Sequence, residues 1–589
     1  IVVAEVFIMR IRTTKTKNGR LFYVIKTYYD TNGKEHSLTV EKLGNENDIR
    51  AKYNCDPDVW AKEYVAKLNA KEAEELKPIQ VSFSPKSLIS KNHQYSYNVG
   101  YLFLQNLYHN LGLDQICKKI AARHEFEYDL NDILAKLIYG RILSPCSKTA
   151  TLRFSKKLLE QPNFDEHQIY RALDVIAEEA DFIQEQVYSN SFAMGKRHCN
   201  VIYYDCTNLF FDIDEPDEDG LRKFGKSKEN RSLPIVEMGL FIDSDGIPLV
   251  MCIHPGNTNE QITLKPLEEK LLSDFHMSKF IVCTDAGLAS KANRKFNDLG
   301  DRAFIVTQSI KKLKADLKEW ALDTKDWRRP GSRSKQTIDI SKIDKEKDFD
   351  TVFYKEQWID QGTFEEKIIV TYSLKYREYQ RKVREGQIER AVRSIESGTA
   401  KRGTKNQNDY RRFIEKTSVT TDGEIADKNT FCLNTERITE EELYDGYYAV
   451  VTNLESDPTE IIKINKMRWK IEECFRIMKS DFKARPVYVK TENRIKAHFI
   501  TCFLSLVIYR YLEKVTNYKY TCDQLLETLK EMNMREIMGE GYIPSYTRTE
   551  ITDVIHEIFG FRTDYQIIDR ANMKKILKQS KTKIRYAKI

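Results

Sequence analysis

An acidic side chain stands between two basic ones in the segment from Arg468 to Lys479. The segment contains no Gly or Pro and therefore predicts a helix. At about 100° per residue, Arg468, Glu472 and Lys479 fall within roughly 60° of one another on one face. A carboxylate at the border of a buried face needs a cation or a metal as its partner. Alone, this pattern is more typical of an ordinary amphipathic helix with internal ion pairs.

Two further acids occur in predicted strands upstream. Asp205 lies inside a β-branched and aromatic run over residues 200–211, and Asp285 ends a short buried run over residues 279–285. Three converging carboxylates, Asp205, Asp285 and Glu472, could hold two Mg²⁺ ions. One ion would activate water or a 3′-hydroxyl, and the other would stabilise the leaving oxygen of an in-line phosphoryl transfer. Singly, each acid is more often a turn or ion-pair residue, so the ordered set carries the hypothesis.

The elements around these acids predict a mixed α/β layer. From residue 200 onward the patterns give the order β-β-β-α-β-α-β, including a hairpin across Ser244-Asp245-Gly246. A further strand is predicted at residues 445–452, a helix at about 458–483, and a long apolar helix at 493–513. We therefore expect a catalytic core formed by residues 200–307 and 445–515.

Four other regions flank or interrupt this core. Residues 1–97 predict a β-hairpin followed by a helix at about 57–77. Residues 98–199 are helical, and a helix-turn-helix-like DNA reader and a plain helical support domain are equally compatible with them. Residues 308–444 predict a partly β insertion, with 13 Lys and Arg against 6 Asp and Glu between residues 371 and 420. This surplus of basic residues could bind the phosphate backbone of a nucleic acid. An ordinary charged helix exposed to solvent explains it equally well. Residues 516–589 predict a helical region with a basic tail.

The composition limits the other classes of function. The 589 residues are 41% hydrophobic and 31% charged, with a net charge of only +7, so a nucleic-acid surface must arise from local clustering. The eleven cysteines include no CxxC pair, which indicates free thiols in a reducing compartment and no zinc-finger site. Cys206, Cys283 and Cys474 adjoin the three acids and are expected to be small buried residues rather than nucleophiles. No apolar run reaches membrane-spanning length.

The ordered motifs resemble those of DDE insertion-sequence transposases. Asp205 and Asp285 match the two aspartates, and Arg468, Glu472 and Lys479 match R, E and K of the Y-x2-R-x3-E-x6-K signature at the family's spacing. The signature tyrosine is replaced by Asn465. The resemblance covers residues 200–515 specifically and residues 10–200 more loosely. It includes Gly225-Lys226-Ser227-Lys228, Pro255-Gly256-Asn257-Thr258, Arg494 and His498.

This resemblance implies an RNase H-like core that uses Mg²⁺, with Mn²⁺ able to substitute. It also implies a cytoplasmic enzyme that nicks double-stranded DNA at transposon terminal inverted repeats and joins the 3′-hydroxyl to target DNA, as a homodimer or higher multimer on paired ends. Arg468 and Lys479 would contact phosphates near the cut. Arg494 and His498 would contact DNA, with a supporting role as the alternative for His498. The replacement of the tyrosine by Asn465 affects a position that in the family handles the flipped or hairpinned DNA end.

Several alternatives stay open at this stage. Glu473 adjoins Glu472 but points about 100° away, so we expect it to face solvent or an ion pair. Asp212 and Asp214 are expected in the loop that ends the first strand. For the whole protein, the alternatives are an RNase H-like nuclease that cuts without joining and a domesticated transposase that only binds DNA. The presence of all three acids argues against the last.

Overall fold

The computed structural model describes residues 9–17, 19–29, 35–75, 78–331, 337–401, 409–419 and 425–586. The chain divides into two compact units, residues 1–93 and 94–589. The first unit contains an antiparallel sheet of order β1-β2-β3 and two helices. Their bounds are β1 Met9–Thr16, β2 Gly19–Tyr29, β3 Glu35–Asn45, α1 Glu46–Tyr53 and α2 Pro57–Glu75. The predicted hairpin is β2–β3, and its predicted turn at residues 30–33 lies outside the described residues.

After a short strand, β4 at Ser96–Asn98, the second unit continues with helices, as the sequence predicts for residues 98–199. They are α3 Tyr101–Asn110, α4 Leu113–Ala121, α5 Leu130–Leu143, α6 Lys148–Ser155, α7 Glu166–Glu178 and α8 Ala180–Ser191. Helices α3, α5 and α7 pack against α16, Glu492–Val515. Within the described residues, α16 alone is long and apolar enough to cross a membrane, but 94% of its apolar window is buried inside the protein. It is therefore a core helix.

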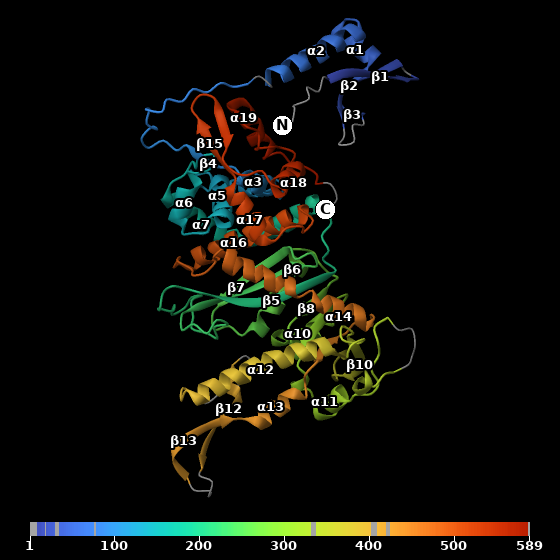
Figure 1. Cartoon of the computed structure of the whole chain (residues 1–589), viewed down its shortest axis with the longest axis vertical. Coiled ribbons are helices and arrows are strands. Elements are labelled where there is room, and N and C mark those ends of the chain that lie inside the picture. The colour runs from blue at the N-terminus through green and yellow to red at the C-terminus, as the bar shows by residue number, and fades with distance from the viewer. Residues whose placement is uncertain are drawn as a thin grey trace. The chain divides into compact units, whose positions relative to one another are not determined.

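An eight-stranded mixed sheet forms the centre of this unit (Figure 1). Its order is β10-β11-β14-β9-β8-β5-β6-β7, in which only the β5–β8 and β8–β9 pairs are parallel. The strands are β5 Val201–Phe210, β6 Ile235–Asp243, β7 Pro248–Pro255, β8 Ile281–Thr284, β9 Ala303–Gln308, β10 Phe353–Asp360, β11 Glu365–Tyr372 and β14 Tyr447–Thr452. The segment from β5 to β9 follows the predicted β-β-β-α-β-α-β order, with α9 Leu264–Ser273 and α10 Lys291–Asn297 as its helices.

The alternation of side chains along β5 divides the core into two layers. The segment 458–483, which carries the R-x3-E-x6-K motif, is called the signature segment below. Tyr203 and Leu209 of β5 belong to the same apolar cluster as Ile471 and Cys474 of this segment. Tyr204 and its neighbours on that face pack instead against α9. Successive strand residues point to opposite faces, so the odd-numbered positions of β5 face the signature segment and the even-numbered positions face α9.

The signature segment is not one straight helix. It consists of α14 Pro458–Lys466, α15 Trp469–Arg476 and a π-helical turn, η7, at Ile477–Asp481. The single helix predicted over about 458–483 is therefore corrected to three pieces. The first helix ends at Met467, whose N–H donates to both Lys463 and Ile464 carbonyls, and the wider π turn changes the direction in which Lys479 projects.

The insertion is partly β, as predicted, but its strands belong to two sheets. Strands β10 and β11 extend the central sheet, whereas β12 Ile414–Val419 and β13 Ile425–Leu433 pair only with each other among the described strands. The insertion helices are α11 Ala315–Leu322, α12 Leu374–Glu396 and α13 Thr435–Glu442. Helix α12 contacts β13 and lies beside it in Figure 1.

The C-terminal region is helical in part only, which corrects the prediction. Helices α17 Cys522–Glu531, α18 Glu550–Phe559 and α19 Arg570–Gln579 alternate with three short strands. These strands, β15 Asn533–Ile537, β16 Gly541–Pro544 and β17 Ile568–Asp569, form a four-stranded sheet with β4, Ser96–Asn98. Strands this short show little periodicity, and β4, one of the two partners of β15, lies far away in sequence.

A buried ion pair fixes the end of β6 and yields a stability prediction. Arg197 and Asp243 are almost completely buried, and Nε donates to Oδ2 over 2.6 Å. We expect Asp243→Ala to lower the free energy of unfolding by about 3–5 kcal/mol, because the guanidinium loses its buried partner. Urea denaturation measures this. Glu440→Ala, which removes an exposed ion pair with Arg437, serves as the control and is expected to cost less than about 1 kcal/mol. Equal losses in the two variants would contradict the prediction.

Candidate active site

Asp205 and Asp285 lie on neighbouring parallel strands. The register of β5 and β8 pairs Val201 with Ile281 and Tyr203 with Cys283, and the same offset places Asp285 beside Asp205. Asp285 follows the last residue of β8 and caps a short 3-10 turn, where its Oδ1 accepts from the Gly287 N–H over 2.9 Å. The structure therefore brings these two predicted carboxylates together in the middle of the sheet, at the point where β8 ends.

The environment of Asp205 is electrostatically unusual. Burial raises the pKa of its carboxyl to about 6, and the neighbouring Asp285 acts in the same direction. Lys228, Arg468 and the N–H of Cys206, which donates to Oδ1 over 2.8 Å, oppose that shift. Desolvation and a like charge both disfavour ionisation, whereas nearby cations favour it. When Asp205 and Asp285 are both ionised, nearby positive charge is therefore needed to stabilise them.

Arg468 lies close to both Asp205 and Glu472. Its Nη1 donates to Thr307 Oγ1 over 3.0 Å, and its Nη2 lies 3.8 Å from Glu472 Oε1. The positive charge of the same guanidinium acts to lower the pKa of Asp205, against the effect of burial. The Glu472 side chain is 65% exposed and lines a cavity of about 720 Å³. Glu473, by contrast, pairs with Arg510 over 3.1 Å, as expected for a residue that points away.

The chemistry of this donor set fits a hard divalent cation. Asp205 and Asp285 offer adjacent carboxylate oxygens, which are the ligands that Mg²⁺ prefers. Within the described part of the chain, no three His, Cys, Asp or Glu side chains are close enough to form a metal site as they stand. Glu472 and Arg468 line the same cavity. The described interactions include no direct contact between Glu472 and either aspartate. Metal binding by all three acids therefore stays a prediction.

The other predicted DNA-binding residues lie in different environments. Lys479 projects from η7, and its Nζ lies 3.6 Å from Glu229 Oε1. Arg494 is partly exposed on α16, where it pairs with Asp174 over 3.6 Å. His498 is buried, its Nε2 lies 2.9 Å from the Ala484 carbonyl oxygen, and burial holds its pKa well below the ordinary value. Of the two roles considered for His498, this position favours support.

Sequence reasoning assigned no role to Lys228, which the structure places at the site. Its Nζ donates to the Cys206 carbonyl over 2.5 Å and lies 2.8 Å from Glu260 Oε1. Partial burial opposes its charged form, but Asp205 and Glu260 outweigh that effect and raise its pKa. Lys228 belongs to the basic motif of residues 225–228, so the motif was noticed, but nothing in its spacing indicates which acid it would meet.

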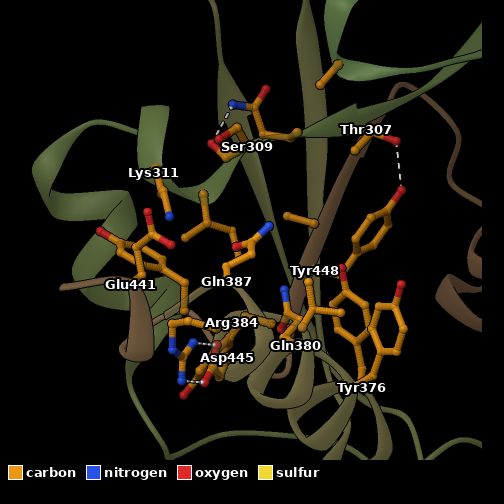
Figure 2. A pocket seen from close by; sticks show the side chains of 18 of the residues that line it. Thr307, Ser309, Lys311, Tyr376, Gln380, Arg384, Gln387, Glu441, Asp445 and Tyr448 are labelled. Atoms are coloured by element: carbon orange, nitrogen blue, oxygen red, sulfur yellow. Dashed lines mark hydrogen bonds and ion pairs between the residues drawn. The ribbon is translucent and has the colours of Figure 1, made fainter. Parts of the chain in front are cut away.

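A tyrosine from a neighbouring strand lies beside the position where the signature tyrosine is missing. Asn465 is buried on α14, and its Nδ2 donates to the Tyr448 hydroxyl over 2.8 Å. That hydroxyl is also 2.8 Å from Thr307 Oγ1, the atom that accepts from Arg468 (Figure 2). Asn465, Tyr448, Thr307 and Arg468 therefore form one continuous hydrogen-bonded chain.

The insertion contributes to the surroundings of this chain. A second cavity, of about 380 Å³, lies between α12 and the sheet, and Tyr376 and Tyr448 line both cavities. Figure 2 shows Arg384 of α12 paired with Asp445, with Nη1 donating to Oδ1 over 2.6 Å. This pair is almost fully buried and holds α12 next to the strand that carries Tyr448.

The raised pKa of Asp205 predicts a pH-dependent gain from neutralising it. In the folded state the pKa is about 6 and in the unfolded state about 3.8, so the carboxyl opposes folding increasingly as the pH rises from about 3.8 to about 6, and the full cost is present above pH 6. We expect Asp205→Asn to stabilise the metal-free protein at pH 8 by at most about 3 kcal/mol, and by about 1 kcal/mol less at pH 5.

Urea denaturation at both pH values in EDTA measures the difference. Asp212→Asn, which removes a carboxylate outside this pair, is the matched control. A stabilisation by Asp205→Asn that is equal at pH 5 and pH 8 would contradict the assignment of the shift.

Comparisons with known proteins were made by sequence and by structure. Residues 210–508 match the family described as the transposase DDE domain. Asp285, Glu472 and Lys479 lie inside this match, and Asp205 lies shortly before its first residue. No curated protein sequence matches the chain.

Among solved structures, one similar chain is that of a piggyBac transposase synaptic complex with hairpin DNA, with 9% identity over 83% of this chain and 86% of that chain and a TM-score of 0.34. Another is the Mos1 transposase paired-end complex with the left transposon end, with 14% identity over 39% of this chain and 64% of that chain and a TM-score of 0.13. These structural likenesses are too distant to add to the argument. The family match, however, spans more than half of the 589 residues, and on that basis the chain belongs to the transposase DDE domain family.

Proposed function

We propose that the protein is a DNA transposase that cleaves the ends of a mobile element and joins them to target DNA by metal-dependent phosphoryl transfer. The observation that carries this proposal is that Asp205 and Asp285 lie side by side where β8 ends, with Arg468 close to Asp205. The mixed β-β-β-α-β-α-β order of the core supports an RNase H-like fold for this centre. The family membership supports transposition as the reaction class.

Asp205 and Asp285, together with Glu472, would hold the divalent metal. When bound, Mg²⁺ ions supply activation of a water or 3′-hydroxyl nucleophile and stabilisation of the leaving oxygen. The raised pKa of Asp205 and its two cationic neighbours support this assignment, because the pair is stable in its ionised form only with nearby positive charge. Mn²⁺, with the same preference for oxygen ligands, is expected to substitute.

The protein's own cations would position the DNA. Arg468 presents a guanidinium between Thr307 and Glu472, where it would bind a phosphate close to the cut. Lys479 would bind a second phosphate from η7. Since the net charge is only +7, we infer that these local groups, rather than bulk charge, direct the DNA backbone to the acids.

The substrate would be double-stranded DNA carrying terminal inverted repeats, and the working form a homodimer or higher multimer on paired ends. Two narrower functions remain as alternatives, a nuclease that cuts without joining and a protein that only binds DNA. Purified protein, DNA ends taken from the flanks of its reading frame, a target plasmid and Mg²⁺ distinguish them. Joined products support transposition, cleavage alone supports the nuclease, and binding without cleavage in Mg²⁺ and Mn²⁺ supports the third.

The triad prediction concerns three conservative variants. We expect Asp205→Asn, Asp285→Asn and Glu472→Gln each to reduce cleavage and joining more than about 100-fold, the loss that even outer-shell changes at metal sites reach. DNA binding, measured in EDTA by fluorescence anisotropy, should be retained. Glu473→Gln is the matched control beside Glu472, and it should keep most of the activity if it folds. Cleavage at the wild-type rate in any of the three variants would remove that residue from the site.

The second prediction concerns the tyrosine beside Asn465. We expect Tyr448→Phe to lower the free energy of unfolding by about 1–3 kcal/mol, because the buried Asn465 amide loses its acceptor. Cleavage of DNA ends should fall as well, since Thr307 then orients Arg468 without its hydroxyl partner. Tyr379→Phe, on the same cavity but exposed, is the control. Unchanged stability and cleavage in Tyr448→Phe would show that the hydrogen-bonded chain has no role.

A further inference from the structure

The segment from Lys226 to Arg231, between β5 and β6, places opposite charges on the two sides of the candidate site. Lys228 reaches the acidic side, where it meets Glu260 and lies close to Asp205. The next residue, Glu229, reaches the basic side, where it meets Lys479 and Arg485. Adjacent residues of one segment thus supply a cation to the carboxylates and a carboxylate to the cations.

Glu229 is shared by three cations, which come from two segments of the chain. Its carboxylate forms an ion pair with Arg485, lies 3.6 Å from Lys479 Nζ and lies 3.5 Å from Arg231 Nε. Lys479 comes from η7, Arg485 from the segment that follows it, and Arg231 from the same loop as Glu229. Such convergence of cations on one anion is the arrangement that binds a phosphate group.

The aromatic ring of Phe210 supports two of these cations. The guanidinium of Arg231 lies 4.3 Å from the ring centroid, and that of Arg485 lies 5.4 Å from it. Phe210 is the last residue of β5, the strand that carries Asp205. Packing over a ring limits the motion of a guanidinium and leaves its N–H groups free to donate in the plane of the guanidinium. The two arginines are therefore held in position by the sheet itself.

The cations are costly to keep in place without an anion. Burial lowers the pKa of Lys479, with a further contribution from Lys228, and burial also lowers the pKa of Arg485. The Arg485 Nε is buried and has no hydrogen-bond partner in the described structure. Glu229 relieves part of this cost, but a group with more acceptor oxygens than a carboxylate would satisfy the cluster better.

We propose that Lys479, Arg485 and Arg231 form a binding site for a DNA phosphate, and that Glu229 fills this site in the DNA-free protein and is displaced when DNA binds. The inference rests on the proposed function in one respect, since the phosphate is taken to belong to the DNA at the active site. It adds Arg485 and Arg231 to the binding surface and gives Glu229 the role of an internal competitor.

The consequence is that binding of any DNA is weakened by the same carboxylate. A phosphate gains the contacts of three cations only after the Glu229 ion pairs are broken, so only DNA with sufficient further contacts opens the site. Removing the charge of Glu229 is expected to tighten binding of DNA regardless of its sequence.

The test compares Glu229→Gln with the wild-type chain for binding to a random-sequence duplex, measured by fluorescence anisotropy in EDTA. We expect Glu229→Gln to bind roughly threefold to tenfold more tightly at low salt, with the difference shrinking as salt screens the charges. Glu550→Gln is the matched control, because it makes the same change in net charge and frees Lys519, an exposed lysine in the C-terminal region. Glu229→Asp keeps the charge and should bind like the wild type.

A second variant tests the cations. We expect Arg485→Gln to weaken binding and to lower the salt slope of the binding constant by about one. Its effect should be larger in the Glu229→Gln background than in the wild type, because Glu229 no longer competes for the guanidinium. If Glu229→Gln alone is unstable, the Arg485→Gln variant still tests the site, because unchanged binding of the duplex by Arg485→Gln would overturn the phosphate site. Thermal unfolding of each variant establishes that it is folded.

The outcomes separate this inference from the proposed function. The proposal that Glu229 is an internal competitor would be overturned if Glu229→Gln bound DNA no more tightly than Glu550→Gln. It would also be overturned if the effects of Glu229→Gln and Arg485→Gln on binding were strictly additive. Neither result depends on cleavage. If the variants show the predicted differences in binding but the wild-type protein neither cuts nor joins DNA, this inference stands and the transposase proposal fails.

Discussion

The parallel pairing of β5 with β8 is the constraint on which the rest of the site depends. It places two carboxylates side by side in a partly desolvated position, and the pKa of Asp205 records the cost. Lys228 and Arg468 reach this pair from separate parts of the chain and offset that cost. Two acids held close together in a partly buried position must be compensated by nearby cations of the protein.

The long core helix α16 determines where the signature segment lies. Arg510, buried on α16, donates to the Lys470 carbonyl over 3.3 Å and pairs with Glu473 and Glu513. The apolar side of α15, through Ile471 and Cys474, packs on the odd-numbered face of β5. Arg510 and this packing together orient α15, so that Glu472 faces the cavity while Glu473 faces the core helix.

Much of the site was predictable, because its acids occur at strand positions that a short apolar pattern marks. The strand positions of Asp205 and Asp285 follow from such patterns, and the ion pair of Glu473 follows from its direction on the helix. Cys206, Cys283 and Cys474 are buried free thiols, as expected. The break at Met467 and the π turn at η7 were not predictable, since the sequence from Thr459 to Asp481 contains no Gly or Pro. The contacts of Lys228 and Glu229 and the pairing of β4 with β15 depend on residues far apart in sequence, which local periodicity does not report.

The position of β11 in the central sheet has a consequence for how this chain could have evolved. Strand β14, which carries Tyr448, is paired on one side with β9 and on the other with β11, a strand of the insertion. Excising the insertion as a block would leave β14 as an open edge with unpaired backbone groups. Changes of length between relatives should therefore be confined to segments that leave the sheet and return to it, such as α12 to α13. The hairpin β10–β11 should be inherited together with the catalytic core.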